Sequence, residues 1–265
     1  MRLIVLSAVL AAGCLPVFAA DNPDGKDGVD VQQTIQKFAA KETEFSQARN
    51  NYTYRQSVKL EELDASGNPS GGKWELIEDI IFTPEGKRME KVVYAPVQSL
   101  RYIILTPSDE QDLRNVQPFV MTTAEIADYD TNYLGREKVD EIGCYVFSVK
   151  PKKLVPGKRY FEGQIWVDDR DLQIVKTYGK GVGVKKGDEQ FPKFETYREQ
   201  IDGKYWFPTY THADDTLHFK AGPQRIRMTV KYQDYKHYEG RSTIKYGEVV
   251  DEKKTTTTPP APPKK

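Results

Sequence analysis

Two short runs in the sequence carry residue types that can bind metal ions. His212 and His218 flank the carboxylates of Asp214 and Asp215, and zinc accepts imidazole and carboxylate ligands. Closed zinc sites need four ligands in a set geometry, and the run lacks the tight spacing of zinc motifs. The run Asp168–Asp171 lacks the spaced oxygen ligands and the glycine of a calcium loop. We therefore expect a polar loop at the first run, a solvated hairpin turn at the second, and no metal or other cofactor.

The sequence gives no sign of a catalytic centre. Gly179–Gly183, followed by Lys185 and Lys186, has the composition of a phosphate-binding loop, but a P-loop needs GxxxxGK[ST] between a strand and a helix. The neighbouring segments have strand patterns, which favours a flexible loop. No Gly-x-Ser-x-Gly nucleophile elbow occurs, and no carboxylate pair stands out among the 39 acidic residues. We expect a protein that is not an enzyme, with Cys144 as a small buried hydrophobic residue.

Composition limits the class of partner. The 265 residues include 39 basic and 39 acidic side chains, so the formal net charge is zero. A dedicated nucleic-acid binder would carry a basic stripe, so no nucleic-acid partner is expected. Sixteen Tyr, 11 Phe and 3 Trp provide large buried areas, enough for the core of one large domain.

The N-terminal residues have the pattern of a secretory signal peptide. Met1 and Arg2 precede an apolar run from Leu3 to Phe18, and small residues follow at Ala19. This pattern predicts a signal peptide over residues 1–19, cleaved after Ala19, and export to the periplasm of a Gram-negative bacterium. The alternative is lipidation of Cys14, because residues 10–14 resemble a lipoprotein box with its Leu one place too early. Lipidation would anchor the protein to the envelope.

The remaining chain predicts one helix followed by a long series of antiparallel strands. Residues 20–30 are polar and expected to be flexible. Apolar residues at Val31, Ile35, Phe38 and Phe45 have helical spacing, and Asp30 is suited to be the N-cap. Alternation then predicts strands over Tyr52–Glu61, Trp74–Thr83, Arg88–Tyr94, Leu134–Val139, Cys144–Lys150, Gln164–Val167, Leu172–Thr177, Phe194–Ile201, Tyr205–Thr211 and Arg225–Tyr235.

One segment with two possible helices interrupts the predicted strands, and a polar tail follows the last strand. Thr106-Pro107 and Thr122–Glu125 have helix-start patterns, which predicts short helices over one face of the sheet. Residues 251–265 are rich in Thr, Pro and Lys and are expected to be a disordered tail, which leaves a domain over residues 31–250. The predicted antiparallel sheet either forms a half-open barrel with room for a ligand or packs against its helices as a plain two-layer core.

Several strand blocks resemble the outer-membrane lipoprotein-sorting family, the LolA/LolB-like periplasmic carriers. The blocks are Tyr133–Glu137, Cys144–Lys152, Gln164–Asp168, Ile174–Lys176 and Phe207-Pro208, in the family's order and after a helix at 31–50. The resemblance covers most of residues 31–238. It implies a mainly β (α+β) fold, a half-open antiparallel β-barrel of about eleven strands, with an N-terminal helix and short lid helices over an apolar cavity.

The resemblance also implies a function. It points to a monomeric, non-enzymatic carrier or receptor whose cavity binds the acyl chains of a lipid or lipoprotein, and which meets a membrane surface or a membrane-bound transfer partner. The alternative is an envelope interaction or scaffold module with a closed core. An exported hydrolase would require His212 and His218 to meet distant carboxylates. The expected cavity-lining residues are Tyr54, Val58, Leu76, Ile80, Phe147, Ile165, Val167, Phe194, Ile226, Met228 and Val230.

Overall fold

The computed structural model describes residues 28–83, 85, 87–107, 109–110, 121–183 and 191–238. The predicted signal peptide with Ala19 and Cys14, most of the predicted flexible segment 20–30, and the predicted tail 251–265 lie outside these residues. So do Lys185 and Lys186.

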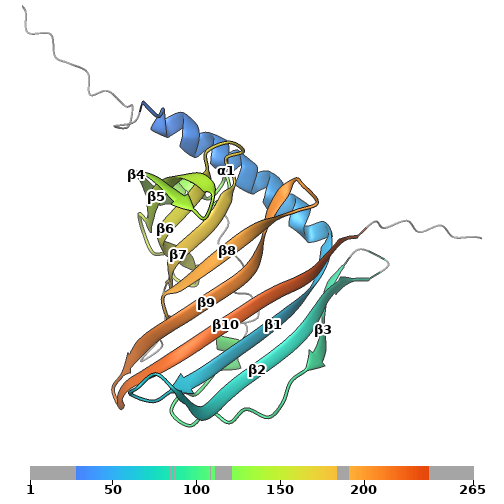
Figure 1. Ribbon diagram of the computed structural model, residues 1–265, viewed down its shortest axis with the longest axis vertical. Coiled ribbons are helices and arrows are strands. Elements are labelled where there is room, and N and C mark those ends of the chain that lie inside the picture. The colour runs from blue at the N-terminus through green and yellow to red at the C-terminus, as the bar shows by residue number, and fades with distance from the viewer. Residues whose placement is uncertain are drawn as a thin grey trace, which may run out of the picture.

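The described residues form one antiparallel sheet that does not close. Its strands follow the order β3-β2-β1-β10-β9-β8-β7-β6-β5-β4, so β3 and β4 are its two edges. Figure 1 shows the sheet bending strongly, with β4 to β7 turned away from the plane of β8 to β3. The strands are β1 Tyr52–Leu63, β2 Pro69–Phe82, β3 Arg88–Tyr94, β4 Tyr129–Val139, β5 Ile142–Pro151, β6 Tyr160–Asp168, β7 Ile174–Val182, β8 Phe194–Ile201, β9 Tyr205–Phe219 and β10 Gly222–His237. The predicted half-open antiparallel barrel is confirmed, with ten strands in the described residues where about eleven were expected.

A single helix precedes the sheet. The helix α1 runs over Val31–Ala48, and Asp30 caps it as predicted, because its Oδ1 accepts a hydrogen bond from the Gln33 backbone N–H at 2.8 Å. A short 3-10 helix, η1 (Arg49–Asn51), joins α1 directly to β1. Figure 1 shows α1 crossing over the side of the sheet that holds β4 to β9. Among the described residues, none of the helices combines the length and the apolar character needed to span a bilayer.

The connection from β3 to β4 joins the two edges of the sheet. This crossover segment, residues 95–128, contains both predicted helix starts. At the first, the carboxylate of Asp109 accepts hydrogen bonds from the N–H and hydroxyl of Thr106 at 3.0 and 2.7 Å, and a helical turn begins at Pro107. At the second, Glu125 accepts the same pair of bonds from Thr122. The predicted second helix is only a turn and the 3-10 helix η2 (Ile126–Asp128).

Two segments predicted as loops belong to strands. Residues 212–218 lie inside β9, because their polar side chains alternate with buried residues such as Ala213 and Leu217. Gly179 and Gly181 lie in β7. A Cβ on Gly179 or on Gly163 of β6 would collide with the backbone of the facing strand, so glycine is required for this pairing.

Candidate ligand-binding face

The predicted cavity-lining residues lie on one face of the sheet, which we call the inner face. Direct cross-strand pairs define one row across it, and residues that pair directly point to the same side. In strand order the row is Tyr133, Phe147, Ile165, Thr177, Thr196, Thr211, Val230, Val58 and Leu76. Both ends of this row are apolar, and its centre consists of three threonines. Thr196 and Thr211 share a hydrogen bond of 2.8 Å between their hydroxyls.

The predicted apolar residues of the inner face fall into two clusters on either side of these threonines, and Phe45 of α1 forms a third cluster with Tyr52 and Phe207. Phe147, Ile165 and Val167 belong to the first cluster, which lies on β4 to β7. The second cluster lies on β1, β2, β9 and β10 and contains, of the predicted residues, Val58, Leu76, Ile226, Met228 and Val230, with Tyr54 packed against it. Phe194 packs against both clusters, and Ile80 is buried on β2. The structure thus gathers the predicted residues on one face, while their role as ligand contacts stays a prediction.

The inner face is covered by other parts of the chain. Phe147, Ile165 and Val230 are 0% exposed, so each contacts protein atoms on all sides. A ligand can reach these side chains only if a covering segment moves. Two different segments provide the cover.

The helix α1 covers the first cluster. Ile35, Phe38 and Ala39 are buried in it, and the ring of Phe38 lies 5.4 Å from that of Phe147. Burying a phenylalanine side chain in this way contributes roughly 2–3 kcal/mol. The predicted apolar stripe of the helix therefore faces the sheet.

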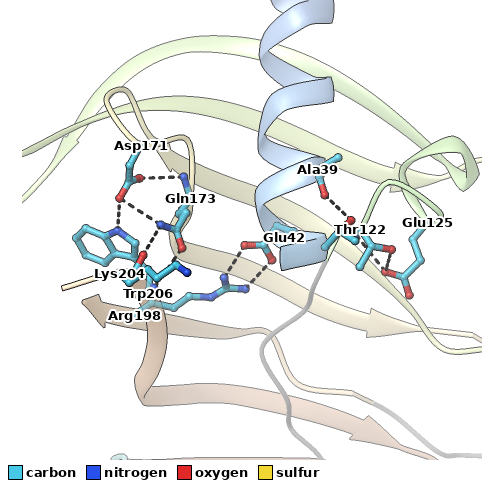
Figure 2. Close-up of polar contacts among 10 residues, drawn as sticks. Ala39, Glu42, Thr122, Glu125, Asp171, Gln173, Arg198, Lys204 and Trp206 are labelled. Atoms are coloured by element: carbon cyan, nitrogen blue, oxygen red, sulfur yellow. Dashed lines mark hydrogen bonds and ion pairs between the residues drawn. The ribbon is translucent and has the colours of Figure 1, made fainter. Parts of the chain in front are cut away.

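A buried ion pair attaches α1 to β8. The guanidinium of Arg198 donates two hydrogen bonds to the carboxylate of Glu42, at 2.8 and 3.2 Å, and both side chains are almost fully buried (Figure 2). Arg198 follows a β-bulge and also lies over the ring of Phe45 at 5.0 Å. Sequence analysis did not identify this pair. The one signal for it was a glutamate on the apolar stripe of the predicted helix.

An irregular segment covers the second cluster. We call residues 99–105 the strap. Leu100, Ile103 and Leu105 of the strap pack against the cluster on β1, β2, β9 and β10. These three side chains are only half-buried, and Ile104 between them is exposed.

The strap is held by one buried carboxylate and, at Ser99, by hydrogen bonds to β2. The Glu62 side chain on β1 is fully buried and accepts hydrogen bonds from three consecutive backbone N–H groups, those of Arg101, Tyr102 and Ile103. The shortest distances are 3.0, 2.7 and 2.8 Å. Gly72 on β2 provides the space for this carboxylate, because a Cβ at Gly72 would collide with it. Sequence analysis also missed Glu62. Glu61 and Glu62 point to opposite faces of β1, and two identical residues in succession do not show which of them is buried.

The end of the crossover segment nearest β4 contacts α1. Thr43 of α1 accepts a hydrogen bond from the backbone N–H of Thr123 at 3.0 Å, and Met121 is buried in the first cluster. Figure 2 shows Thr122 and Glu125 beside the helix, close to Glu42. The far end of the crossover segment is therefore fixed to α1.

The edge next to the strap exposes apolar side chains. Met89, Val92, Val93 and Tyr94 of β3 are each nearly half exposed, and Val97 and Ile104 are almost fully exposed. An edge strand with free backbone groups and apolar side chains is a surface for association with a partner or a membrane.

The opposite face carries its own small core. Cys144, Val146, Trp166 and Val175 form a buried cluster there. Burial raises the pKa of the Cys144 thiol to about 11, which agrees with the predicted hydrophobic role.

The predicted solvated turn at Asp168–Asp171 is partly structural. Asp168 is buried, and this burial raises the pKa of its carboxyl. Asp171 accepts a hydrogen bond from the Trp206 indole N–H at 2.8 Å, and the Gln173 amide donates to the backbone oxygen of Lys204 at 2.9 Å (Figure 2). The turn therefore anchors the β8–β9 hairpin, a role that the acidic composition of the turn did not reveal.

The histidine run does not form a metal site in the described part of the chain. His212 stacks with Tyr210, and Asp214 accepts hydrogen bonds from Arg225 and Arg227 at 3.0 and 2.9 Å. Burial opposes ionisation of Asp214, but the two guanidinium groups outweigh it and lower the pKa. Within the described ranges, no group of three or more potential ligands could hold a metal ion.

Comparisons with known proteins concern the fold. No protein-family model matches the chain, and no curated protein matches it in sequence. A DUF1329 family protein from Desulfovibrio piger is similar in structure, with a TM-score of 0.41, 16% identity, and coverage of 80% of this chain and 95% of that one. A LolA superfamily protein from Nitrosomonas europaea has a TM-score of 0.33, 15% identity, and coverage of 78% and 93%. A lipoprotein-sorting domain from Vibrio parahaemolyticus has a TM-score of 0.33, 12% identity, and coverage of 77% and 93%.

The chain has the half-open antiparallel sheet and the N-terminal helix that its strand blocks predicted. An unclosed antiparallel sheet curves around an N-terminal helix, with its apolar face turned toward that helix.

Proposed function

We propose that this protein is a non-enzymatic carrier or receptor of the bacterial envelope that binds the acyl chains of a lipid or lipoprotein. One observation carries the proposal: the apolar inner face of an unclosed sheet is covered by two separate segments, α1 and the strap. Because the sheet does not close around this face, a segment can move aside while the strands stay paired.

The energetics favour exchange of the strap for an acyl chain. Each buried methylene contributes about 0.8 kcal/mol, so a chain of twelve carbons would gain on the order of 10 kcal/mol before the costs of ordering it. The strap covers its cluster with three half-buried side chains, Leu100, Ile103 and Leu105. To replace the strap, a ligand must bury more apolar surface than these three side chains do.

The other parts of the proposal concern location and partners. The signal-peptide pattern supports a periplasmic location, with Cys14 lipidation as the anchored alternative. The exposed apolar residues of β3 and the strap support contact with a membrane surface or a membrane-bound partner. We expect a monomer, without cofactor.

Native mass spectrometry tests the proposal. The mature protein would be purified from a bacterial periplasm, and any bound molecule would be extracted with solvent and identified. We expect phospholipid, fatty acid or acylated peptide in near-stoichiometric amount. An empty protein that also fails to bind an apolar fluorescent probe would contradict the carrier function.

A scaffold module with a closed core is the second candidate. The complete burial of Phe147, Ile165 and Val230 favours it, because these residues contact protein atoms on all sides. A disulfide that fixes the strap to β2 distinguishes the two functions. Such a cross-link blocks probe binding by a carrier and has no effect on a scaffold.

A further inference from the structure

The strap contains a preformed anion-binding site that Glu62 occupies. The backbone N–H groups of Arg101, Tyr102 and Ile103 all donate to the Glu62 carboxylate. Consecutive N–H groups that converge on one point form an anion-binding concavity, and such bonds to a charged acceptor are strong. In this conformation the anion is a side chain of the protein itself.

This anion site lies at the border of an apolar surface. Ile103 donates to Glu62 through its backbone and packs against the second cluster with its side chain. Leu60, two residues before Glu62 on the same face of β1, belongs to that cluster. An anion site beside an apolar bed matches the chemistry of an anionic amphiphile, a molecule with a charged headgroup and a hydrocarbon chain.

The carboxylate is held by main-chain donors and by a cleared space. It accepts hydrogen bonds from the three strap N–H groups, and Gly72 lies directly against it. The strap side chains are not needed for these bonds. An incoming phosphate or carboxylate therefore accepts hydrogen bonds from the same N–H groups once Glu62 no longer occupies them.

From these contacts we infer that Glu62 is an internal competitor for an anionic headgroup, and that the strap N–H groups bind this headgroup when the acyl chain occupies the second cluster. The inference rests on the proposed function and specifies its ligand class as an anionic lipid or acylated anion. Glu62 thereby keeps the strap in place when no ligand is bound. On binding, the headgroup of the ligand replaces the Glu62 carboxylate as the anion that accepts from the strap N–H groups.

Glu62→Gln tests the inference, because glutamine keeps the shape of the side chain and removes its charge. Isothermal titration would measure the binding of dodecyl phosphate, of dodecyl maltoside with an uncharged headgroup, and of inorganic phosphate. We expect the variant to bind dodecyl phosphate about tenfold more tightly than the parent, roughly the effect of one charge-assisted hydrogen bond, and dodecyl maltoside with less than about a twofold change. Inorganic phosphate should bind far more weakly than dodecyl phosphate.

Two further variants complete the test. Glu61→Gln is the matched control, since Glu61 is the neighbouring glutamate on the opposite face and pairs with Lys59. It should leave all three affinities unchanged. Gly72→Ala displaces the Glu62 carboxylate without altering its charge, and should favour dodecyl phosphate in the same direction.

The outcomes separate the inference from the proposed function. If both amphiphiles bind and Glu62→Gln changes them by the same factor, the anion site is wrong and the carrier function stands. Equal affinity for inorganic and dodecyl phosphate would assign the site to a free anion and overturn the lipid ligand. If no amphiphile binds any variant, both proposals fail. Loss of the folded circular dichroism spectrum in both Glu62→Gln and Gly72→Ala would assign Glu62 to stability alone.

Discussion

The two halves of the inner face are covered in different ways, although their strands are built alike. On β4 to β7 the cover is a regular helix with fully buried side chains and a buried ion pair to β8. On β1, β2, β9 and β10 it is an irregular strap with half-buried side chains, held by backbone hydrogen bonds to one carboxylate and by hydrogen bonds of Ser99 to β2. From this difference we predict that one sheet combines a permanent cover and a removable one. We expect α1 to remain in place while the strap moves.

Removal of the buried ion pair should have the largest effect. Arg198→Ala leaves the Glu42 carboxylate buried without its guanidinium, so we expect a loss of about 3–5 kcal/mol in the free energy of unfolding. Urea denaturation followed by circular dichroism would measure it. The control is Glu44→Gln, which removes an exposed pair with Lys41 and should cost less than about 0.5 kcal/mol. A loss below 1 kcal/mol for Arg198→Ala would mean that α1 is not firmly attached.

Truncation of apolar side chains compares the two covers directly. Phe38→Ala should destabilise the protein by about 3–5 kcal/mol, because it leaves a cavity under the helix. Ile103→Ala should cost only about 1 kcal/mol, because a half-buried side chain loses less contact and the strap can readjust. Denaturant titrations of both variants measure the difference. Equal losses would contradict the distinction between a permanent and a removable cover.

Hydrogen exchange should show that the strap opens on its own. We expect the amides of Arg101, Tyr102 and Ile103 to exchange through local opening, at a free energy a few kcal/mol below that of global unfolding. Amides within α1 should exchange only near the global value. Glu62→Gln should accelerate exchange in the strap and leave α1 unchanged. Equal acceleration in both segments would show that the two covers open together.

Cys144 reports on the opposite face, where we expect the smallest effect. Burial raises the pKa of its thiol from 9.0 to about 11, so at pH 8 the reactive thiolate should be about a hundredfold scarcer than in the unfolded chain. Alkylation by iodoacetamide, followed by mass spectrometry, should be slow in the parent and equally slow in Glu62→Gln. The raised pKa also means that this group contributes stability below pH 9, which is lost as the pH rises toward 11. Rapid alkylation of the folded protein at pH 8 would contradict this burial.

The sequence predicted the sheet well because burial of one face imposes alternation. The bounds of β3 were predicted as they are observed, and the eleven predicted residues share one face because alternation also assigns the side to which a residue points. Residues 212–218 were mistaken for a loop because outward-facing positions of a long strand can be entirely polar. Alternation carries no information about which outward residues pair with each other.

The buried charges could not be predicted from the sequence. Glu42 and Arg198 are 156 positions apart, and only the folded sheet brings them together. Glu62 is stabilised by backbone N–H groups, which every residue except proline possesses, so no side-chain type at positions 101–103 indicates the contact. The strands of the sheet could therefore be predicted from one sequence, but the contacts that hold α1 and the strap on it could not.

The pairing of β1 with β10 has a consequence for how the protein folds. Tyr52 pairs with His237, and Leu63 with Arg225, so this junction of the sheet joins residues more than 160 positions apart. Contacts of such high sequence separation form slowly, because a long loop must close before they form. The hairpin of β1 to β3 and the meander of β4 to β9 can each assemble from neighbouring strands, but they unite only when the last strand arrives. We expect a slow final folding step that a chain ending before β10 cannot complete.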